Sequence, residues 1–204
     1  IHSVAENLTK MQKDGKESTE ELAFGILEKQ WDTSSYRNQR TKESQDKVKS
    51  KDMVKTYMEW EKNNPNTPVD VEAKFRIEIN DVTISGMIDR VEQTPEGEYE
   101  VVDFKTGYAY KNKNTIKEDV QMNIYALGTE KLYGKLPKKT SLFYIKDNKF
   151  VPHFIEKETL DEFTKSLGEK VDNIFDEKFD AAPEFRKCSR CDYASICDAK
   201  EEVS

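Results

Sequence analysis

The strongest constraint on the fold is a run of alternating apolar and polar residues in the middle of the chain. From Val69 to Ile79 every second residue is apolar, which is the period of a β-strand with one buried face. Asn80-Asp81 is a turn signal before a second strand at 82–91, and Pro95-Glu96-Gly97 is another before a third strand at 98–105. This order predicts a three-strand antiparallel meander.

Segments of helical and strand period flank this meander. We expect helices over 1–30 (broken at Asp14-Gly15), 41–63, 116–133 and 160–175, and short strands at 141–146 and 149–155. This order predicts an α/β fold with a mixed central sheet flanked by helices. We expect one domain over 1–204, with N-terminal helices at 1–63, a catalytic core at 69–155, and a C-terminal helix and cysteine segment at 157–204.

Two carboxylates are brought together by the second turn of the meander. In a hairpin centred on Glu96, Asp89 lies opposite Asp103, and directly opposed residues have Cβ atoms roughly 5 Å apart. Lys105 follows Asp103 by two residues and therefore projects from the same face of the strand. The sequence thus predicts two carboxylates and one ammonium on a small patch of sheet.

Such a cluster needs a compensating cation. At an effective dielectric of ~20, two carboxylates ~5 Å apart repel by roughly 3 kcal/mol. Lys105 supplies part of the compensation and Mg²⁺, a hard cation that prefers carboxylate oxygens, would supply more. A bound metal ion of this kind activates water against a phosphodiester. The alternative is a surface Asp–Lys pair worth about 0.2–1 kcal/mol, but the apolar residues Val101, Val102 and Phe104 indicate a strand inside the sheet.

Gln121 and Tyr125 lie four residues apart on the helix that follows the third strand, so they share one helix face. This helix follows the third strand closely, so its first turns can cover the carboxylate–lysine patch. We expect Gln121 to orient a water or phosphate and Tyr125 to contact the nucleic-acid backbone. The alternative is an exposed glutamine and a half-buried core tyrosine.

Four short motifs, in order along the chain, resemble the PD-(D/E)XK nuclease superfamily in its RecB/AddB-like branch. They are Val71-Glu72-Ala73, Ser85-Gly86-Met87-Ile88-Asp89-Arg90, Val101-Val102-Asp103-Phe104-Lys105-Thr106-Gly107 and Gln121-Met122-Asn123-Ile124-Tyr125. The resemblance covers roughly residues 1–200 and implies a restriction-endonuclease-like core.

The resemblance also implies roles for single residues. Asp89, Asp103 and the Phe104 carbonyl would bind Mg²⁺ or Mn²⁺, and Lys105 would be the catalytic lysine. Gln121 and Tyr125 would be an accessory motif, with Glu72 and Arg90 as supporting residues. Ile1-His2 resembles the end of a metal-binding motif of this branch, so His2 would be a further ligand.

Cys188, Cys191 and Cys197 are the three cysteines of the chain. Their crowding is typical of metal ligation and not of a disulfide framework, and it indicates a reducing, cytoplasmic setting. In the nuclease branch that the chain resembles, such a triplet joins a distant cysteine around a [4Fe–4S] cluster. We expect this cluster, or zinc, in the intact protein, and an incomplete or absent cluster in this chain.

The net charge of −7 argues against a nucleic-acid partner when taken alone. The charge is uneven, however: residues 105–117 carry four lysines and no acid, and residues 131–149 carry six lysines and one acid. Basic patches of this kind bind phosphates locally, although solvated lysines give the same pattern. No apolar stretch is long enough to span a membrane.

These features lead us to expect a Mg²⁺-dependent DNA nuclease domain. Because the chain lacks an initiator methionine, we expect a fragment of a longer helicase–nuclease in DNA repair or recombination, with a helicase domain as partner. One alternative is a stand-alone CRISPR-adaptation or phage-type exonuclease. Another is a non-catalytic module of nuclease fold that only binds DNA.

Overall fold

The structure is a computed structural model that describes residues 1–199. Its helices are α1 (His2–Lys13), α2 (Glu20–Lys29), α3 (Arg40–Asn63), α4 (Val120–Tyr133), α5 (Lys157–Phe175) and α6 (Phe185–Cys188), with 3₁₀ turns η1 (Ser34–Tyr36) and η2 (Ile145–Asp147). Its strands are β1 (Thr67–Ile79), β2 (Val82–Gln93), β3 (Tyr99–Lys105), β4 (Lys139–Tyr144) and β5 (Lys149–Phe154).

The strands form one five-stranded sheet in the order β1-β2-β3-β4-β5, with β3 at its centre. The β1–β2, β2–β3 and β4–β5 pairs are antiparallel, whereas β3 and β4 are parallel. The parallel pair requires a crossover connection, and α4 provides it. The prediction of a mixed α/β fold with an antiparallel meander and further strands is therefore confirmed.

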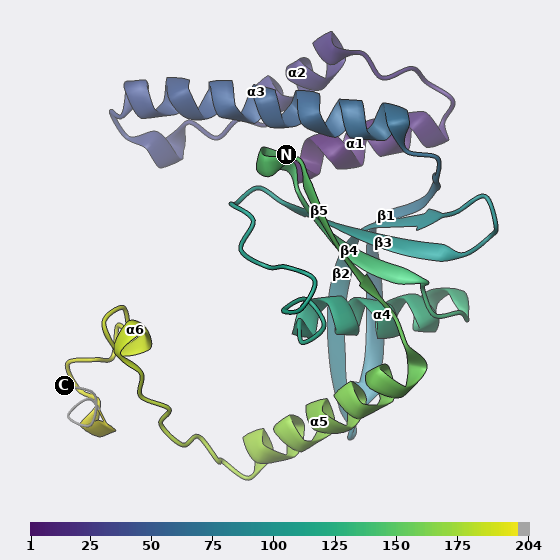
Figure 1. Cartoon of the computed structure of the whole chain (residues 1–204). Helices are drawn as coiled ribbons and strands as arrows, with labels where there is room; N and C mark the ends of the chain where they lie inside the picture. Colours follow the sequence, from purple (N-terminus) through teal and green to yellow (C-terminus); the bar gives the residue numbers. More distant parts are fainter. Residues whose placement is uncertain (200–204) are drawn as a thin grey trace.

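Helices cover both faces of this sheet (Figure 1). On one face, apolar residues of α1, α2 and α3 form a core with Val102, Phe104, Phe143 and Ile145. On the other face, α4 and α5 pack over a core that includes Phe75, Ile88 and Val101. Val101 and Val102 enter opposite cores, so successive residues of β3 face opposite layers of helices. Asp103, two residues after Val101, therefore faces the same side of the sheet as Val101.

Phe75 shows how tightly α4 packs on the sheet. Its ring is 3 % exposed and lies against Gly86 of β2 and Gly128 of α4, where a Cβ atom would come within 2.5 and 2.7 Å of ring carbons. These two glycines therefore allow the helix and the ring to approach each other closely. This packing fixes α4 above the sheet, and with it the two side chains that α4 contributes to the site.

Some predicted boundaries were wrong. The helix expected from Ile116 begins at Val120, because the carboxylate of Asp119 caps it by accepting the N–H of Met122. The strand expected over 141–146 is β4, which starts and ends two residues earlier and is followed by η2. The last five residues of the predicted C-terminal segment lie outside the described residues. In the part that is described, no helix is long and apolar enough to cross a membrane.

Candidate active site

The centre of the candidate site is the end of β3, the middle strand. Asp103 is buried, with 2 % of its surface exposed, and the Lys105 ammonium lies 2.7 Å from its Oδ2 atom. Burial raises the pKa of Asp103 to about 6, an effect that the nearby Asp89 carboxylate adds to and that Lys105 opposes. The predicted position of Asp103 and Lys105 on one face of the strand is confirmed by this ion pair.

Asp89 lies at the point where the β2–β3 ladder ends. The last pair of the ladder is Arg90 with Val102. This is the predicted register, but the pairing ends one residue before Asp89. The expected cross-strand pairing of Asp89 with Asp103 is therefore wrong in detail. The Oδ2 atom of Asp89 instead accepts a hydrogen bond from the backbone N–H of Phe104 at 2.9 Å. The side-chain carboxylate thus takes the place of a backbone carbonyl of β2 as the acceptor for this N–H.

His2 reaches the same place from the first turn of α1. Its Nε2 atom lies 2.6 Å from the carbonyl oxygen of Phe104 and 3.4 Å from Oδ2 of Asp89. The hydrogen bond with Asp89 raises the pKa of His2, and burial opposes this rise. An imidazole nitrogen, a carboxylate oxygen and a backbone carbonyl oxygen thus converge beside Asp103, although they come from positions 2, 89 and 104.

α4 contributes a short chain of hydrogen bonds to the other side of Lys105. The Lys105 ammonium donates to Oε1 of Gln121 at 2.9 Å, and Nε2 of Gln121 donates to the hydroxyl of Tyr125 at 2.8 Å. Burial, reinforced by Asp103 and Asp89, raises the pKa of Tyr125. The structure therefore brings Gln121 and Tyr125 to the lysine, as the spacing on one helix face predicted.

These residues have the chemistry of a site for a hard divalent cation. Mg²⁺ and Mn²⁺ prefer carboxylate, carbonyl and water oxygens. Asp89 and the Phe104 carbonyl offer such oxygens, and the imidazole nitrogen of His2 is in contact with both. Oδ2 of Asp103 is buried, and its close neighbour is the Lys105 ammonium at 2.7 Å. In residues 1–199, however, no three His, Cys, Asp or Glu side chains are placed so that they could together hold a metal ion. The donor atoms therefore fit a metal ion by their chemical type, while Asp103 is turned toward Lys105.

Glu72 lies next to the site on β1. Its neighbours Val71 and Ala73 pair with Arg90 and Ile88, which flank Asp89 on β2. The Glu72 backbone has a positive φ of 51°, a conformation that costs a non-glycine residue about 1–2 kcal/mol. Strain of this kind is typical of functional positions.

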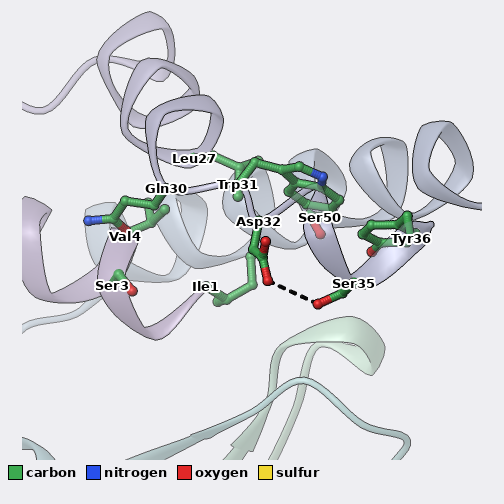
Figure 2. A pocket seen from close by; sticks show the side chains of 10 residues that line it. All are labelled: Ile1, Ser3, Val4, Leu27, Gln30, Trp31, Asp32, Ser35, Tyr36 and Ser50. Carbon is green, nitrogen blue, oxygen red and sulfur yellow. Dashed lines mark hydrogen bonds between the residues drawn. The ribbon is translucent and has the colours of Figure 1, made fainter. Parts of the chain in front are cut away.

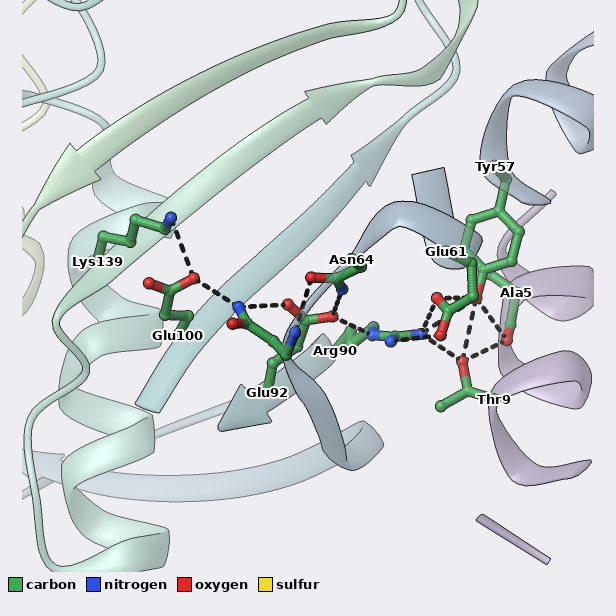
Figure 3. A network of polar contacts seen from close by, with 10 residues as sticks. Ala5, Thr9, Tyr57, Glu61, Asn64, Arg90, Glu92, Glu100 and Lys139 are labelled. Atoms are coloured by element: carbon green, nitrogen blue, oxygen red, sulfur yellow. Dashed lines mark hydrogen bonds and ion pairs between the residues drawn. The ribbon is translucent and has the colours of Figure 1, made fainter. Parts of the chain in front are cut away.

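Arg90, which was predicted as a supporting residue, lies in the interior behind the candidate site. It is fully buried between the sheet and the helices, and its guanidinium donates to Glu92 at 2.6 Å, to Thr9 of α1 at 2.8 Å and to Glu61 of α3 at 2.9 Å. The network, drawn in Figure 3, continues from Glu92 through the side-chain amide of Asn66 to Glu100, which pairs with Lys139. Arg90 therefore ties β2, which carries Asp89, to α1, which carries His2.

A cavity of about 240 Å³ beside the first turn of α1 was not predicted from the sequence. Ile1 and Ser3, the two neighbours of His2, line it together with Trp31, Asp32 and Tyr36 (Figure 2). The Trp31 and Tyr36 rings are stacked, with centroids 5.8 Å apart. None of the carboxylates of the candidate site lines this cavity, so it is separate from the reacting centre.

The cysteine segment lies away from the sheet, beyond a long connection after α5 (Figure 1). All three cysteines are free; Cys188 is half-buried, and Cys191 and Cys197 are exposed. Their thiols do not gather into a metal-binding group among the described residues. Because a [4Fe–4S] cluster takes four cysteines and the chain has three, the residues present do not fit this cluster.

The fold and the site together define a class of protein. A mixed five-stranded sheet covered by helices on both faces, with two acidic residues and a lysine at the end of its central strands, is a restriction-endonuclease-like α/β fold. The sequence model of the PD-(D/E)XK nuclease superfamily matches residues 1–198. The chain therefore belongs to this superfamily.

Curated relatives of the chain are phage proteins. It is 30 % identical over 133 residues to the Gene 69 protein of Mycobacterium phage D29, a match that covers 62 % of this chain and 47 % of that protein. It is 29 % identical over 133 residues to the Gene 69 protein of Mycobacterium phage L5, covering 62 % of this chain and 43 % of that protein. The matches thus span about half the length of these relatives.

A solved structure, that of SSO0001, also resembles the chain. It has 14 % sequence identity and a TM-score of 0.44, and the match covers 98 % of this chain and 85 % of SSO0001.

Proposed function

We propose that this chain is a metal-dependent DNA nuclease domain that hydrolyses phosphodiester bonds. The observation that carries the proposal is the convergence of His2, Asp89 and the Phe104 carbonyl beside the Asp103–Lys105 ion pair. It is supported by membership of a nuclease superfamily. A deoxyribonuclease activity in particular is the part that experiment must establish.

The proposed ligands of Mg²⁺ or Mn²⁺ are His2, Asp89, Asp103 and the carbonyl oxygen of Phe104. Such an ion, when bound, polarises a phosphoryl oxygen and lowers the pKa of a bound water. The chain itself fixes where these ligands stand. The Phe104 N–H holds the Asp89 carboxylate, and the placement of α1 against the sheet brings His2 to the same strand end.

Lys105 is proposed to stabilise negative charge on the phosphoryl group as the bond breaks. Its ammonium lies between Oδ2 of Asp103 and Oε1 of Gln121, so it is oriented before substrate arrives. A lysine held in place in this way stabilises the transition state more than a mobile lysine does, because its ammonium does not have to be reoriented during the reaction. Gln121, itself bonded to Tyr125, is proposed as a positioning residue for Lys105.

For the context of the domain, we favour a phage-type nuclease over part of a helicase–nuclease. The relatives in phages D29 and L5 support this choice, whereas a RecB/AddB-like helicase partner has no support among the relatives found. Roles in DNA repair or recombination stay predictions. The three cysteines are proposed as ligands of zinc or an iron–sulfur cluster only if a fourth ligand joins them. Metal analysis of the purified chain, compared with Cys191→Ser, tests this.

The experiment for the nuclease proposal is cleavage of fluorescent DNA during a titration with Mg²⁺ or Mn²⁺. We expect Lys105→Ala and Asp103→Ala to lose activity by more than about 100-fold, since each removes charge from the reacting centre. Lys170→Ala, which removes an exposed lysine on α5, is the matched control and should cut normally. Full activity in Lys105→Ala would contradict the mechanism, and DNA binding without cleavage by the unmodified chain would favour a non-catalytic module.

A further inference from the structure

The loop that follows β3 carries two exposed aromatic rings close to the candidate site. Tyr108 and Tyr110 lie three and five residues after Lys105, and 70 % and 75 % of their surfaces are exposed. Large aromatic side chains normally bury much of their surface. Exposure of two tyrosines so close to the candidate site points to a binding role.

The fold sets Tyr110 beside the reacting centre. Its ring packs against that of Tyr144, with centroids 6.0 Å apart and an interplanar angle of 75°. Tyr144 is buried, and its partner in the parallel β3–β4 ladder is Lys105. One buried side chain thus separates the exposed ring from the lysine that we propose as catalytic. The Lys111 ammonium lies 5.8 Å from the centroid of the Tyr110 ring, which stays 75 % exposed.

The loop is anchored between these two rings and directly after them. The N–H of Ala109 donates to Oδ2 of Asp147 at 2.6 Å, and Lys111 forms an ion pair with Asp119, the residue that caps α4. The Lys146 ammonium lies 3.4 Å from the centroid of the Tyr108 ring. The rings are therefore held in place before any ligand arrives, which reduces the entropy lost on binding.

The charge of this loop matches a polyanion. Residues 105–117 contain four lysines and no acid. Lys105 and Lys111 are paired with Asp103 and Asp119, so Lys113 and Lys117, together with Lys146 beside Tyr108, supply the positive charge for phosphates. Exposed rings among lysines are the combination that binds single strands, because the lysines contact phosphates while the rings stack on bases. In a duplex the faces of the bases are covered by neighbouring bases, so the exposed tyrosine rings add little to the affinity for a duplex.

We propose that Tyr108 and Tyr110 stack on unpaired bases of single-stranded DNA and so make a single strand the preferred substrate. This inference rests on the proposed function, since it names the substrate of the same site. The surface would hold the strand while the adjoining phosphodiester reaches Asp103 and Lys105.

The test is fluorescence anisotropy of the full chain in EDTA, where binding is measured without cleavage. The probes are a labelled oligothymidylate of about 20 nucleotides, an abasic strand of the same length and a duplex of the same length. We expect the double variant Tyr108→Ala/Tyr110→Ala to bind oligothymidylate about 10-fold or more weakly, with little change for the abasic strand or the duplex. The variant Tyr108→Phe/Tyr110→Phe, which keeps both rings, should bind oligothymidylate normally.

Phe179→Ala is the matched control, because it removes a ring that is 71 % exposed on the segment after α5. Circular dichroism checks that each variant is folded. Unchanged oligothymidylate binding by the double alanine variant would overturn the inference, and so would an equal loss on the abasic strand. Cleavage is measured separately in Mg²⁺: an unmodified chain that binds through the rings but does not cut would refute the proposed function and leave the stacking surface standing.

Discussion

Replacing Arg90 by methionine should test how the site is held together. Arg90 and Glu92 are 0 % and 1 % exposed, so Arg90→Met leaves a buried carboxylate whose remaining partners are the amides of Asn64 and Asn66. Removing one member of a buried ion pair costs about 3–5 kcal/mol. For a chain of this size, each kcal/mol lowers Tm by about 2–4 °C, so we expect a loss of about 10 °C in calorimetry or thermal circular dichroism.

The deficit of this variant should depend on pH. Burial raises the pKa of Glu92 even with Arg90 present, and without the guanidinium the charged form becomes still less favourable. The folded variant then binds a proton more tightly than the unfolded chain does. The stability cost of the ionised Glu92 carboxylate is absent below the ordinary glutamate pKa of about 4.3. It grows as pH rises through the raised pKa of Glu92 in the folded variant. The difference in Tm between the natural chain and Arg90→Met should therefore narrow as pH falls from 8 to 5.

Two further variants make this prediction refutable. Adding Glu92→Gln to Arg90→Met removes the uncompensated charge and should recover much of the lost stability. Lys135→Met breaks a surface ion pair with Glu98, whose side chains are 50 % and 36 % exposed, and should cost less than about 1 kcal/mol. A loss below about 1 kcal/mol for Arg90→Met, or no recovery in the double variant, would refute the reasoning.

Two other predictions concern packing and the lysine. Gly128→Ala should lower stability by about 1–3 kcal/mol in urea unfolding, because its Cβ would meet the Phe75 ring. Gly25→Ala, on an exposed face of α2 with open space around it, should stabilise by about 0.5–1 kcal/mol, and a similar loss in both would contradict the packing argument. Gln121→Ala should slow cleavage by about 10-fold without lowering Tm, because it releases the Lys105 ammonium; an unchanged rate would remove Gln121 from the site.

The meander and much of the site geometry follow from local patterns. Alternation along β1 and two turn signals predict the hairpins, and the β2–β3 register has the expected centre. Strand parity places Lys105 beside Asp103, and helical spacing places Gln121 beside Tyr125. The last two relations lie within one element, whose period determines them, and the hairpin register is set by the turn that joins the strands.

The Arg90 network and the Trp31 cavity could not be read from the sequence in this way. Arg90 lies in a strand that mixes apolar and charged residues, and only the placement of α1 and α3 on the sheet reveals its partners Thr9 and Glu61. The cavity depends on how the first turn of α1, the end of α2 and η1 meet. Such tertiary placement leaves no periodic signal in any one segment.

The position of His2 links these two kinds of information. The sequence pointed to it only through a family resemblance, since a histidine near the start of a chain has no periodic signal. The structure brings it to Phe104 and Asp89 because α1 packs on the sheet through Val4 and Leu8. The same helix presents Thr9 to Arg90. The buried Arg90 guanidinium is therefore coupled to the His2 imidazole through one helix. Loss of the Arg90 hydrogen bonds to α1 should make the position of His2 less fixed, although no proposed metal ligand is changed.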